Sequence, residues 1–342
     1  MGRRLDSYVL IYPQAHGPCR FGQYHTAIDL AMQREGFGDV TIVSPTTKDS
    51  YTLGGQITRE EGKAIRTVLW NSIVIGDVLN RLLWRSRPYE REPGRADAVY
   101  HRWLTELCAA LYEYAAEGTS LFSSYKPILK KLREAAQEFA SIIDRSIPRK
   151  PLVGIIGEIY LRMHEHSNRY TARTLERFGC ETVTASLAEW INYTTALRLF
   201  DVRRKMGERL LPKPRNCNPR GRDLHENGMP REREEANTEK GWIKEFLKYN
   251  ITGLYQNLRM HKTYEAVYDI LDIPVDHSCA HLLSHLDGDY SPELPGEAIL
   301  SIAAAKTWFS EGYHGVVNVM PFGCMPSNNA DWILSYQNAF EQ

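Results

Sequence analysis

The sequence lacks an excess of charge of either sign, and it lacks any long apolar run. Its 342 residues include 42 lysines and arginines against 42 aspartates and glutamates, so no global field recruits a nucleic acid or an anionic membrane. No stretch approaches the roughly 18 apolar residues that a membrane span needs. The start, MGRRLDSYVLIYPQ, carries no signal-peptide cleavage pattern. We therefore expect a cytoplasmic chain with no nucleic-acid or membrane partner.

Cysteine is scarce and scattered along the chain. There are six cysteines and no CxxC pair, which argues against a zinc ribbon and against a disulfide-stapled scaffold. The chain also lacks a phosphate loop of the GxxxxGK type, so any use of ATP belongs to a partner. A metal site has to be assembled from distant parts of the fold. The cysteines are Cys19, Cys108, Cys180, Cys217, Cys279 and Cys324.

The hydrophobic periodicity of the first half predicts an N-terminal α/β domain over residues 1–147. A strand in residues 7–12, a helix ending near Gly36 and a strand in residues 39–45 predict a βαβ unit. Helical patterns fill residues 58–146, which predicts a large helical insertion. Because βαβ units build parallel sheets, ligands are expected at the carboxyl ends of the strands.

The second half, residues 148–342, predicts another α/β domain of the same plan. It begins after the proline-rich stretch SIPRKPLVG. A strand within residues 151–160, a helix over residues 167–179 and a strand over residues 180–186 predict the second βαβ unit. Further segments follow: helix over 186–270 interrupted by a flexible loop at about 211–237, helix over 296–312, strand over 313–322 and a closing helix.

Two cysteines occupy matching places in the two halves. Cys19 follows the first strand in AHGPCRFGQY, and Cys324 follows the last strand in MPFGCMPS. Each precedes a helix, whose positive N-terminal end favours the thiolate. A thiolate there suits a nucleophile, a redox thiol or an iron–sulfur ligand, while the plain alternative is a buried cysteine in a tight turn. A single catalytic nucleophile does not predict a second cysteine at the matching place in the other half. A redox pair predicts a CxxC motif, which is absent. Ligation of an iron–sulfur cluster is therefore the favoured interpretation.

Several other conspicuous residues are expected to be structural. Cys108 has apolar neighbours in a helical pattern and is expected in the core, and Cys217 falls in the predicted loop. Three aromatic residues, Trp70, Trp84 and Tyr89, stand near arginines. Surfaces that stack on nucleic-acid bases or bind CoA have the same pattern. Apolar residues at helical spacing are more often core, so we expect these aromatic side chains to be buried.

The stretch GIIGEIYLRMHEHSNRY places acidic and polar groups directly after a strand. Glu158 is a candidate catalytic proton donor or ligand-orienting group at the expected cleft. Asn168 is expected to cap the next helix. His164, Glu165 and His166 have a weak metal-binding pattern, for which a structural role is the favoured interpretation.

The Cys-bearing segments together carry a family likeness. GPCRFGQYHTAIDLAMQREGF with VTIVSP, KPLVGIIGEIYLRMHEHSNRYTARTLERFGCETVTAS and GEAILSIAAAKTWFSEGYHGVVNVMPFGCMPS resemble the 2-hydroxyacyl-CoA dehydratase (D-component) and activase-related family, which includes double-cubane cluster proteins. The resemblance implies two flavodoxin-like parallel-sheet α/β domains with large helical insertions. It also implies an oxygen-sensitive iron–sulfur cluster, of the 4Fe-4S or double-cubane type, between them.

The same resemblance implies particular ligands and partners. Cys19 and Cys324 match its cysteine motifs and are the expected cluster ligands. The third ligand is either Cys279, in DHSCAHLLSHL, or Cys180, in RFGCETV. An ATP-dependent activase or reductase with its own cluster would deliver low-potential electrons. The chain is expected to form a homodimer or hetero-oligomer and to reduce or dehydrate an acyl-CoA or small substrate.

The chain also departs from this family pattern. It stops at Gln342, soon after the CMP turn, whereas relatives continue through a further strand and helix. We therefore expect either partner subunits that complete the fold or a cluster that is altered or shared. The alternative function is non-catalytic: a cluster-carrying or scaffold subunit of a larger redox complex. A substrate-sized pocket beside the cluster would favour the enzyme, and a large apolar face near a terminus would favour the subunit.

Overall fold

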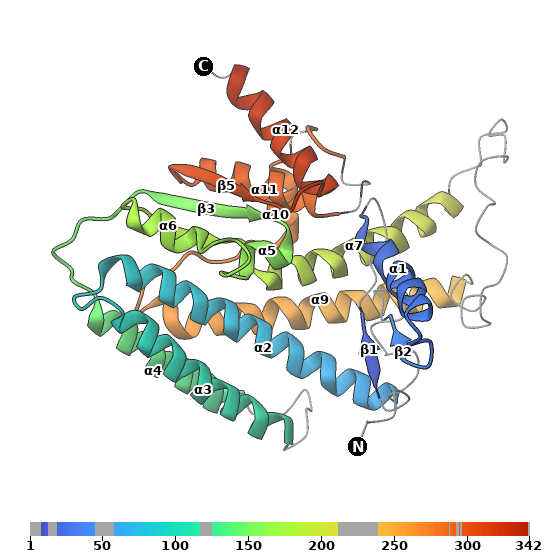
Figure 1. The fold of residues 1–342 in the computed structure, drawn as a ribbon, viewed down its shortest axis with the longest axis horizontal. Helices are drawn as coiled ribbons and strands as arrows, with labels where there is room; N and C mark the ends of the chain where they lie inside the picture. The colour runs from blue at the N-terminus through green and yellow to red at the C-terminus, as the bar shows by residue number, and fades with distance from the viewer. Residues whose placement is uncertain are drawn as a thin grey trace.

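The computed structural model describes residues 8–12, 19–44, 58–116, 125–210, 239–286, 288–291, 294 and 296–340. Within them the chain is a mixed α/β protein that is mostly helical and has two small parallel sheets (Figure 1). The predicted loop at about 211–237, with Cys217, lies outside the described residues. None of the described helices is long and apolar enough to cross a bilayer.

The predicted N-terminal βαβ unit is confirmed. Strand β1 (Val9–Ile11) pairs in parallel with β2 (Thr41–Val43), with Leu10 opposite Ile42. Helix α1 (Phe21–Arg34) connects the two strands. The unit is drawn to the right of the centre in Figure 1.

The second βαβ unit is confirmed too, in a three-stranded sheet. Strands β3 (Leu152–Gly157), β4 (Glu181–Thr184) and β5 (Gly315–Val319) are all parallel, in the order β4-β3-β5. Two short helices, α5 (Ile159–Met163) and α6 (Thr171–Arg177), connect β3 to β4. The β3 strand is buried over most of its length, as expected for a central strand of a covered parallel sheet.

Helix α11 (Glu297–Ser310) covers this sheet and leads into β5. Its sequence, EAILSIAAAKTWFS, is apolar on nearly all sides, and almost all of its residues are buried. Small alanines let the helix approach the sheet, and Gly154 leaves room for the ring of Trp308, which a Cβ atom at that position would overlap. Helices α10 (Cys279–Ser284) and α12 (Met325–Phe340) pack against α11.

Five long helices form the largest apolar core. Helix α2 (Arg59–Ser86) begins with a capping box. The Thr58 hydroxyl accepts from the backbone N–H of Glu61, and the Glu61 carboxylate accepts from the backbone N–H of Thr58. Trp70, Trp84 and Tyr89 are buried in this core, as the sequence predicts. The five helices are α2 (Arg59–Ser86), α3 (Arg95–Ala116), α4 (Lys126–Ile142), α7 (Leu187–Leu210) and α9 (Glu239–Tyr268).

This helical core joins the two sides of the expected domain junction. Helices α2, α3 and α4 come from residues 1–147, whereas α7 and α9 come from residues 148–342, and they pack together. The boundary at residue 148 stays a prediction. Sheets of two and three strands are smaller than the five-stranded sheet of a flavodoxin, so two flavodoxin-like domains are not confirmed.

One expectation about the core is wrong. Cys108 is exposed on α3 rather than buried. The inner face of that helix carries Leu107, Ala110, Leu111 and Tyr114. A helix turns by about 100° per residue, so the position after Leu107 points away from the core although its sequence neighbours are apolar.

Candidate functional site

The candidate site lies at the carboxyl edge of the three-stranded sheet. Strand β3 ends in Gly157 and is followed by Glu158, and β5 ends in Val319, five residues before Cys324. From β3 the chain moves to β4 on one side of it and later returns to add β5 on the other side. The strand order therefore reverses between β3 and β5. Ligands of open α/β sheets bind at such switch points, outside the carboxyl ends of the strands. Gly157 allows the two strand ends to meet closely, because its φ is +120° and a Cβ would strike the Val319 carbonyl oxygen.

Cys324 sits in a tight turn that leads into α12. Its N–H donates to the carbonyl oxygen of Pro321, at 3.1 Å, and its own carbonyl accepts from the N–H of Asn328, at 3.0 Å. The thiol lies 3.4 Å from the hydroxyl oxygen of Ser327. The turn therefore fixes both the backbone and the sulfur at the start of the helix, as the sequence predicts.

Cys19 holds the corresponding place before α1. It directly precedes Arg20, the N-cap residue, and its carbonyl accepts from the N–H of Gly22, at 3.2 Å. Its sulfur accepts a hydrogen bond from the backbone N–H of Phe21. The thiol thus faces the first turn of the helix.

The structure brings these two cysteine turns together. The guanidinium Nη2 of Arg20 donates to the carbonyl oxygen of Phe322, at 3.2 Å. Gly323, between Phe322 and Cys324, has a φ of +72°, and a Cβ there would lie 3.0 Å from the same nitrogen. A side chain at this position would therefore crowd the guanidinium and force it to shift. The Cys324 thiol is close enough to Cys19 to act on its ionisation.

Burial and then the acidic surroundings oppose ionisation of the Cys19 thiol, so its pKa is raised. Although the side chain reaches solvent, the atoms packed around its sulfur raise its pKa, and Glu297, Cys324 and Glu158 raise it further. The N–H of Phe21 lowers the pKa, but it does not outweigh the others. The helix start therefore favours the thiolate as expected, but burial and the neighbouring groups leave the net pKa of Cys19 raised. A cation bound among these groups would favour the thiolate.

Glu158 lies at the site, but its carboxylate serves as a helix cap. Its oxygens accept from the N–H groups of Tyr160, at 3.1 Å, and Leu161, at 2.8 Å. These bonds satisfy two donors at the start of α5. The role of proton donor for Glu158 stays a prediction.

Glu297 is the functional group that the sequence reasoning missed. It opens α11 beside Glu158, and its carboxylate accepts from the N–H of Ile159. Burial and then the charge of Glu158 raise the pKa of Glu297 to about 7, against the opposing charge of Arg162. An acid with this pKa holds a proton near neutral pH. In the sequence, PGEAIL reads only as an acidic residue complementing a helix N-terminus.

The two candidates for a third cysteine ligand lie elsewhere. Cys180 precedes β4 and so sits at the amino edge of the sheet, opposite Cys324. Cys279 is the first residue of α10 and packs against the apolar cluster that includes Leu282 and Ile299. Burial, with a smaller effect of Glu189, raises the pKa of Cys279 to about 11. It lines a cavity of about 270 Å³ between α7, α9 and α10.

The HEHSN segment after α5 has structural partners. The ring of His164 stacks on Tyr160 and bonds to the hydroxyl of Ser167, at 2.8 Å. The amide oxygen of Asn168 accepts from the N–H of Thr171, the first residue of α6, at 3.0 Å, although the N-cap residue of that helix is Tyr170 rather than Asn168. Glu165 belongs to an ion-pair network with Arg173 and Arg87.

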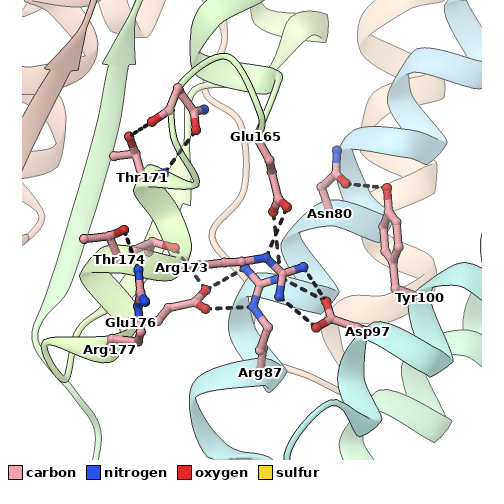
Figure 2. A network of polar contacts seen from close by, with 12 residues as sticks. Asn80, Arg87, Asp97, Tyr100, Glu165, Thr171, Arg173, Thr174, Glu176 and Arg177 are labelled. Atoms are coloured by element: carbon pink, nitrogen blue, oxygen red, sulfur yellow. Dashed lines mark hydrogen bonds and ion pairs between the residues drawn. The ribbon is translucent and has the colours of Figure 1, made fainter.

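Figure 2 shows this network. Its members Arg87, Arg173 and Glu176 line a cavity of about 490 Å³ that is rich in basic side chains. Arg87 binds Glu176 through two hydrogen bonds, at 2.7 and 2.9 Å. Arg173 does the same with Asp97, at 2.8 and 2.9 Å. Three carboxylates thus balance the buried Arg87 and the partly exposed Arg173, and the network ties α6 to the end of α2 and to α3. Neither this cavity nor the one beside Cys279 has Cys19, Cys324 or Glu158 in its wall.

The carboxyl edge therefore gathers two thiols and two carboxyl groups from segments far apart in the chain. When ionised, all four groups are anionic, so they fit a cation, and sulfur donors favour iron and other thiophilic metals. Comparisons with models of known protein families, with curated proteins and with solved structures find no match to this chain.

Proposed function

We propose that this chain is an iron–sulfur protein of the 2-hydroxyacyl-CoA dehydratase-like, activase-related family, with Cys19 and Cys324 as cluster ligands. It accepts low-potential electrons from an ATP-dependent activase or reductase in the cytoplasm. The observation that supports this is the meeting of the two cysteine turns through Arg20 and Phe322.

The fold is compatible with this proposal. The order β4-β3-β5 is the second, first and third strand of the C-terminal half, which matches the beginning of a flavodoxin-like order. The proposed site therefore lies where such folds bind their cofactors. An iron–sulfur cluster would supply one-electron chemistry at this edge, while burial and nearby hydrogen bonds set its potential.

Two thiols do not complete a four-iron cluster. Because Cys180 lies at the opposite edge and Cys279 is packed among apolar side chains, we propose that a second copy of the chain supplies the same two thiols. Phe322 is fully exposed and Met325 is about half exposed, so an apolar surface flanks Cys324 where that copy would dock. A shared [4Fe-4S] cluster predicts two irons per chain and an iron-dependent dimer. Four irons per chain would instead assign the remaining ligands to this chain, with Cys279 first.

Glu297 supplies the proton chemistry in this proposal. Its pKa of about 7 lets it hold a proton that a departing hydroxyl group of a substrate takes up as it leaves as water. Glu158 keeps α5 in place and maintains the raised pKa of its neighbour. Replacing Glu297 with Gln is expected to abolish turnover of an acyl-CoA substrate without lowering the iron content.

The alternative is a cluster-carrying subunit of a larger redox complex. Trp332 and Tyr336 stack on each other on α12, and both are more than half exposed. Neither of the two cavities described above borders Cys19 or Cys324. A carrier keeps its cluster and its redox activity but turns over no substrate alone, so the Glu297→Gln variant would then match the wild type.

The experiment is anaerobic purification followed by reduction with dithionite and electron paramagnetic resonance. A reduced cluster gives a signal from one unpaired electron per cluster, which is lost in the Cys19→Ser and Cys324→Ser variants. Cys108→Ser is the matched control, because Cys108 is exposed on α3. A wild-type chain without iron or signal would refute the proposal.

A further inference from the structure

A second group of potential metal ligands lies away from the cysteine turns. His277, His281 and Glu311 each offer one ligand atom, and these three atoms lie within 4.8 Å of one another. His277 Nε2 is 2.7 Å from a carboxylate oxygen of Glu311. The rings of His277 and His281 are 4.6 Å apart, centre to centre.

Local structure holds each of these residues in place. His277 belongs to the extended segment before α10, and His281 lies in the first turn of that helix. The Ser278 hydroxyl between them accepts from the N–H of His281, at 3.2 Å. Glu311 ends α11, where its N–H donates to the carbonyl oxygen of Thr307, at 3.0 Å. Three fixed backbone positions therefore present the three side chains to one point.

We propose that these residues bind a divalent transition metal of the zinc type. Two imidazole nitrogens and one carboxylate oxygen form a ligand set that Zn²⁺ takes with tetrahedral geometry, leaving a fourth position for solvent. An ion pair between His277 and Glu311 alone does not account for the second imidazole converging on them. His285 stands next in line, with its ring 4.8 Å from that of His281. Its Nδ1 donates to the His281 carbonyl oxygen, at 3.0 Å, and His285 lies outside the group of three converging residues.

This metal site is separate from the proposed cluster. Glu297 opens α11 at the carboxyl edge of the sheet, and Glu311 directly follows the other end of the same helix. A helix of 14 residues is about 21 Å long at 1.5 Å per residue. The metal would join the segment before α10 to the end of α11, the helix that covers the sheet. It would therefore hold these two segments together.

The test is a Co²⁺ titration of the chelator-treated, full-length chain, followed by Zn²⁺ competition. Histidine and carboxylate ligation gives visible d–d absorption without the near-ultraviolet thiolate-to-cobalt band. We expect one such ion per chain, unaffected in the Cys19→Ser/Cys324→Ser double variant. His281→Ala and Glu311→Gln should each weaken binding by more than about 100-fold, because loss of even a second-shell partner costs roughly 10 to 100-fold.

His261→Ala is the matched control, because His261 is exposed on α9 and is expected to leave binding unchanged. His277, His281 and Glu311 are all at least partly accessible, so we expect their variants to fold. Circular dichroism checks that each variant is folded. Co²⁺ binding that shows a thiolate band and disappears in the double cysteine variant would overturn the proposal. So would equal affinity of the wild type, His281→Ala and Glu311→Gln.

Discussion

The guanidinium of Arg20 donates a hydrogen bond to the backbone carbonyl oxygen of Phe322, at 3.2 Å, across 302 positions of the sequence. This bond connects the turn before α1 to the turn before α12, and each turn carries a cysteine. Because the acceptor is a main-chain atom, the backbone conformation of the turn at Phe322 determines whether the Arg20 guanidinium can reach it. The relationship between Cys19 and Cys324 therefore depends on backbone geometry as much as on the thiols.

Gly323→Ala tests that geometry. An alanine at a left-handed φ costs about 1–2 kcal/mol, and here its Cβ would also lie 3.0 Å from Arg20 Nη2. We expect the two turns to separate and the iron content of anaerobically purified protein to fall to less than half. Iron analysis and thermal unfolding measure the two effects.

Gly312→Ala is the control for backbone strain. Gly312 also has a left-handed φ, +86°, but a Cβ there meets nothing within 4 Å. Both variants should lose similar stability, and only Gly323→Ala should lose iron. Equal iron contents in the two variants would show that iron binding does not depend on the Arg20 contact.

Arg87 in the ion-pair network of Figure 2 is expected to matter for stability. Its side chain and that of Glu176 are 6% and 9% exposed. Arg87→Ala leaves the Glu176 carboxylate buried and unpaired, which typically costs about 3–5 kcal/mol. Urea unfolding should show this loss as a lower midpoint with an unchanged slope.

An exposed pair of similar geometry provides the comparison. Arg133 also makes two hydrogen bonds to one carboxylate, that of Asp269, at 2.7 and 2.5 Å. Both side chains reach solvent, where such pairs contribute little. Arg133→Ala should leave the unfolding midpoint nearly unchanged. A loss as large as that of Arg87→Ala would mean that burial is not what decides the effect.

The free energy of unfolding should fall as the pH rises from about 5 to about 7. Burial raises the pKa of Asp77, Glu189 and Glu297 to about 7 each, whereas these groups ionise near pH 4 when unfolded. The folded chain therefore binds more protons in this range, and each group contributes a loss of up to about 1.4 kcal/mol per pH unit. His277 opposes the trend, because burial lowers its pKa.

Asp77→Asn isolates one of these contributions. The carboxylate of Asp77 accepts from the N–H of Ala188, at 2.9 Å, and an amide oxygen can replace that acceptor. The variant should have a shallower pH dependence than the wild type in urea unfolding. Asp269→Asn, at an exposed position, should keep the wild-type slope. Stability that rises between about pH 5 and about pH 7 would contradict the assignment.

The sequence predicts the local elements well and the packing less well. Both βαβ units, the helices between residues 58 and 146 and the closing helix follow from apolar periodicity and from Gly and Pro. The number of strands in each sheet does not follow, because sheet size depends on long-range pairing. The exposure of Cys108 differs from expectation because apolar neighbours on a helix do not determine which face a residue occupies.

The candidate site was partly predictable. Repeated strand–turn–cysteine–helix patterns point to Cys19 and Cys324, since parallel strands end at a common edge. The raised pKa values at Cys19 and Glu297 were not predictable, because they arise from burial and from carboxylates on other elements. The convergence of His277 with Glu311 likewise depends on where α11 ends relative to α10.

Iron and acid-labile sulfide content of the anaerobically purified chain tests the central claim most directly. The wild type, Cys19→Ala, Cys324→Ala and the exposed-site control Cys108→Ala are measured side by side. The account predicts at least two irons and two sulfides per chain of wild type and of the control, from a cluster with equal iron and sulfide counts. It predicts a loss of most of both in Cys19→Ala and in Cys324→Ala. Unchanged iron content in these two variants would contradict it.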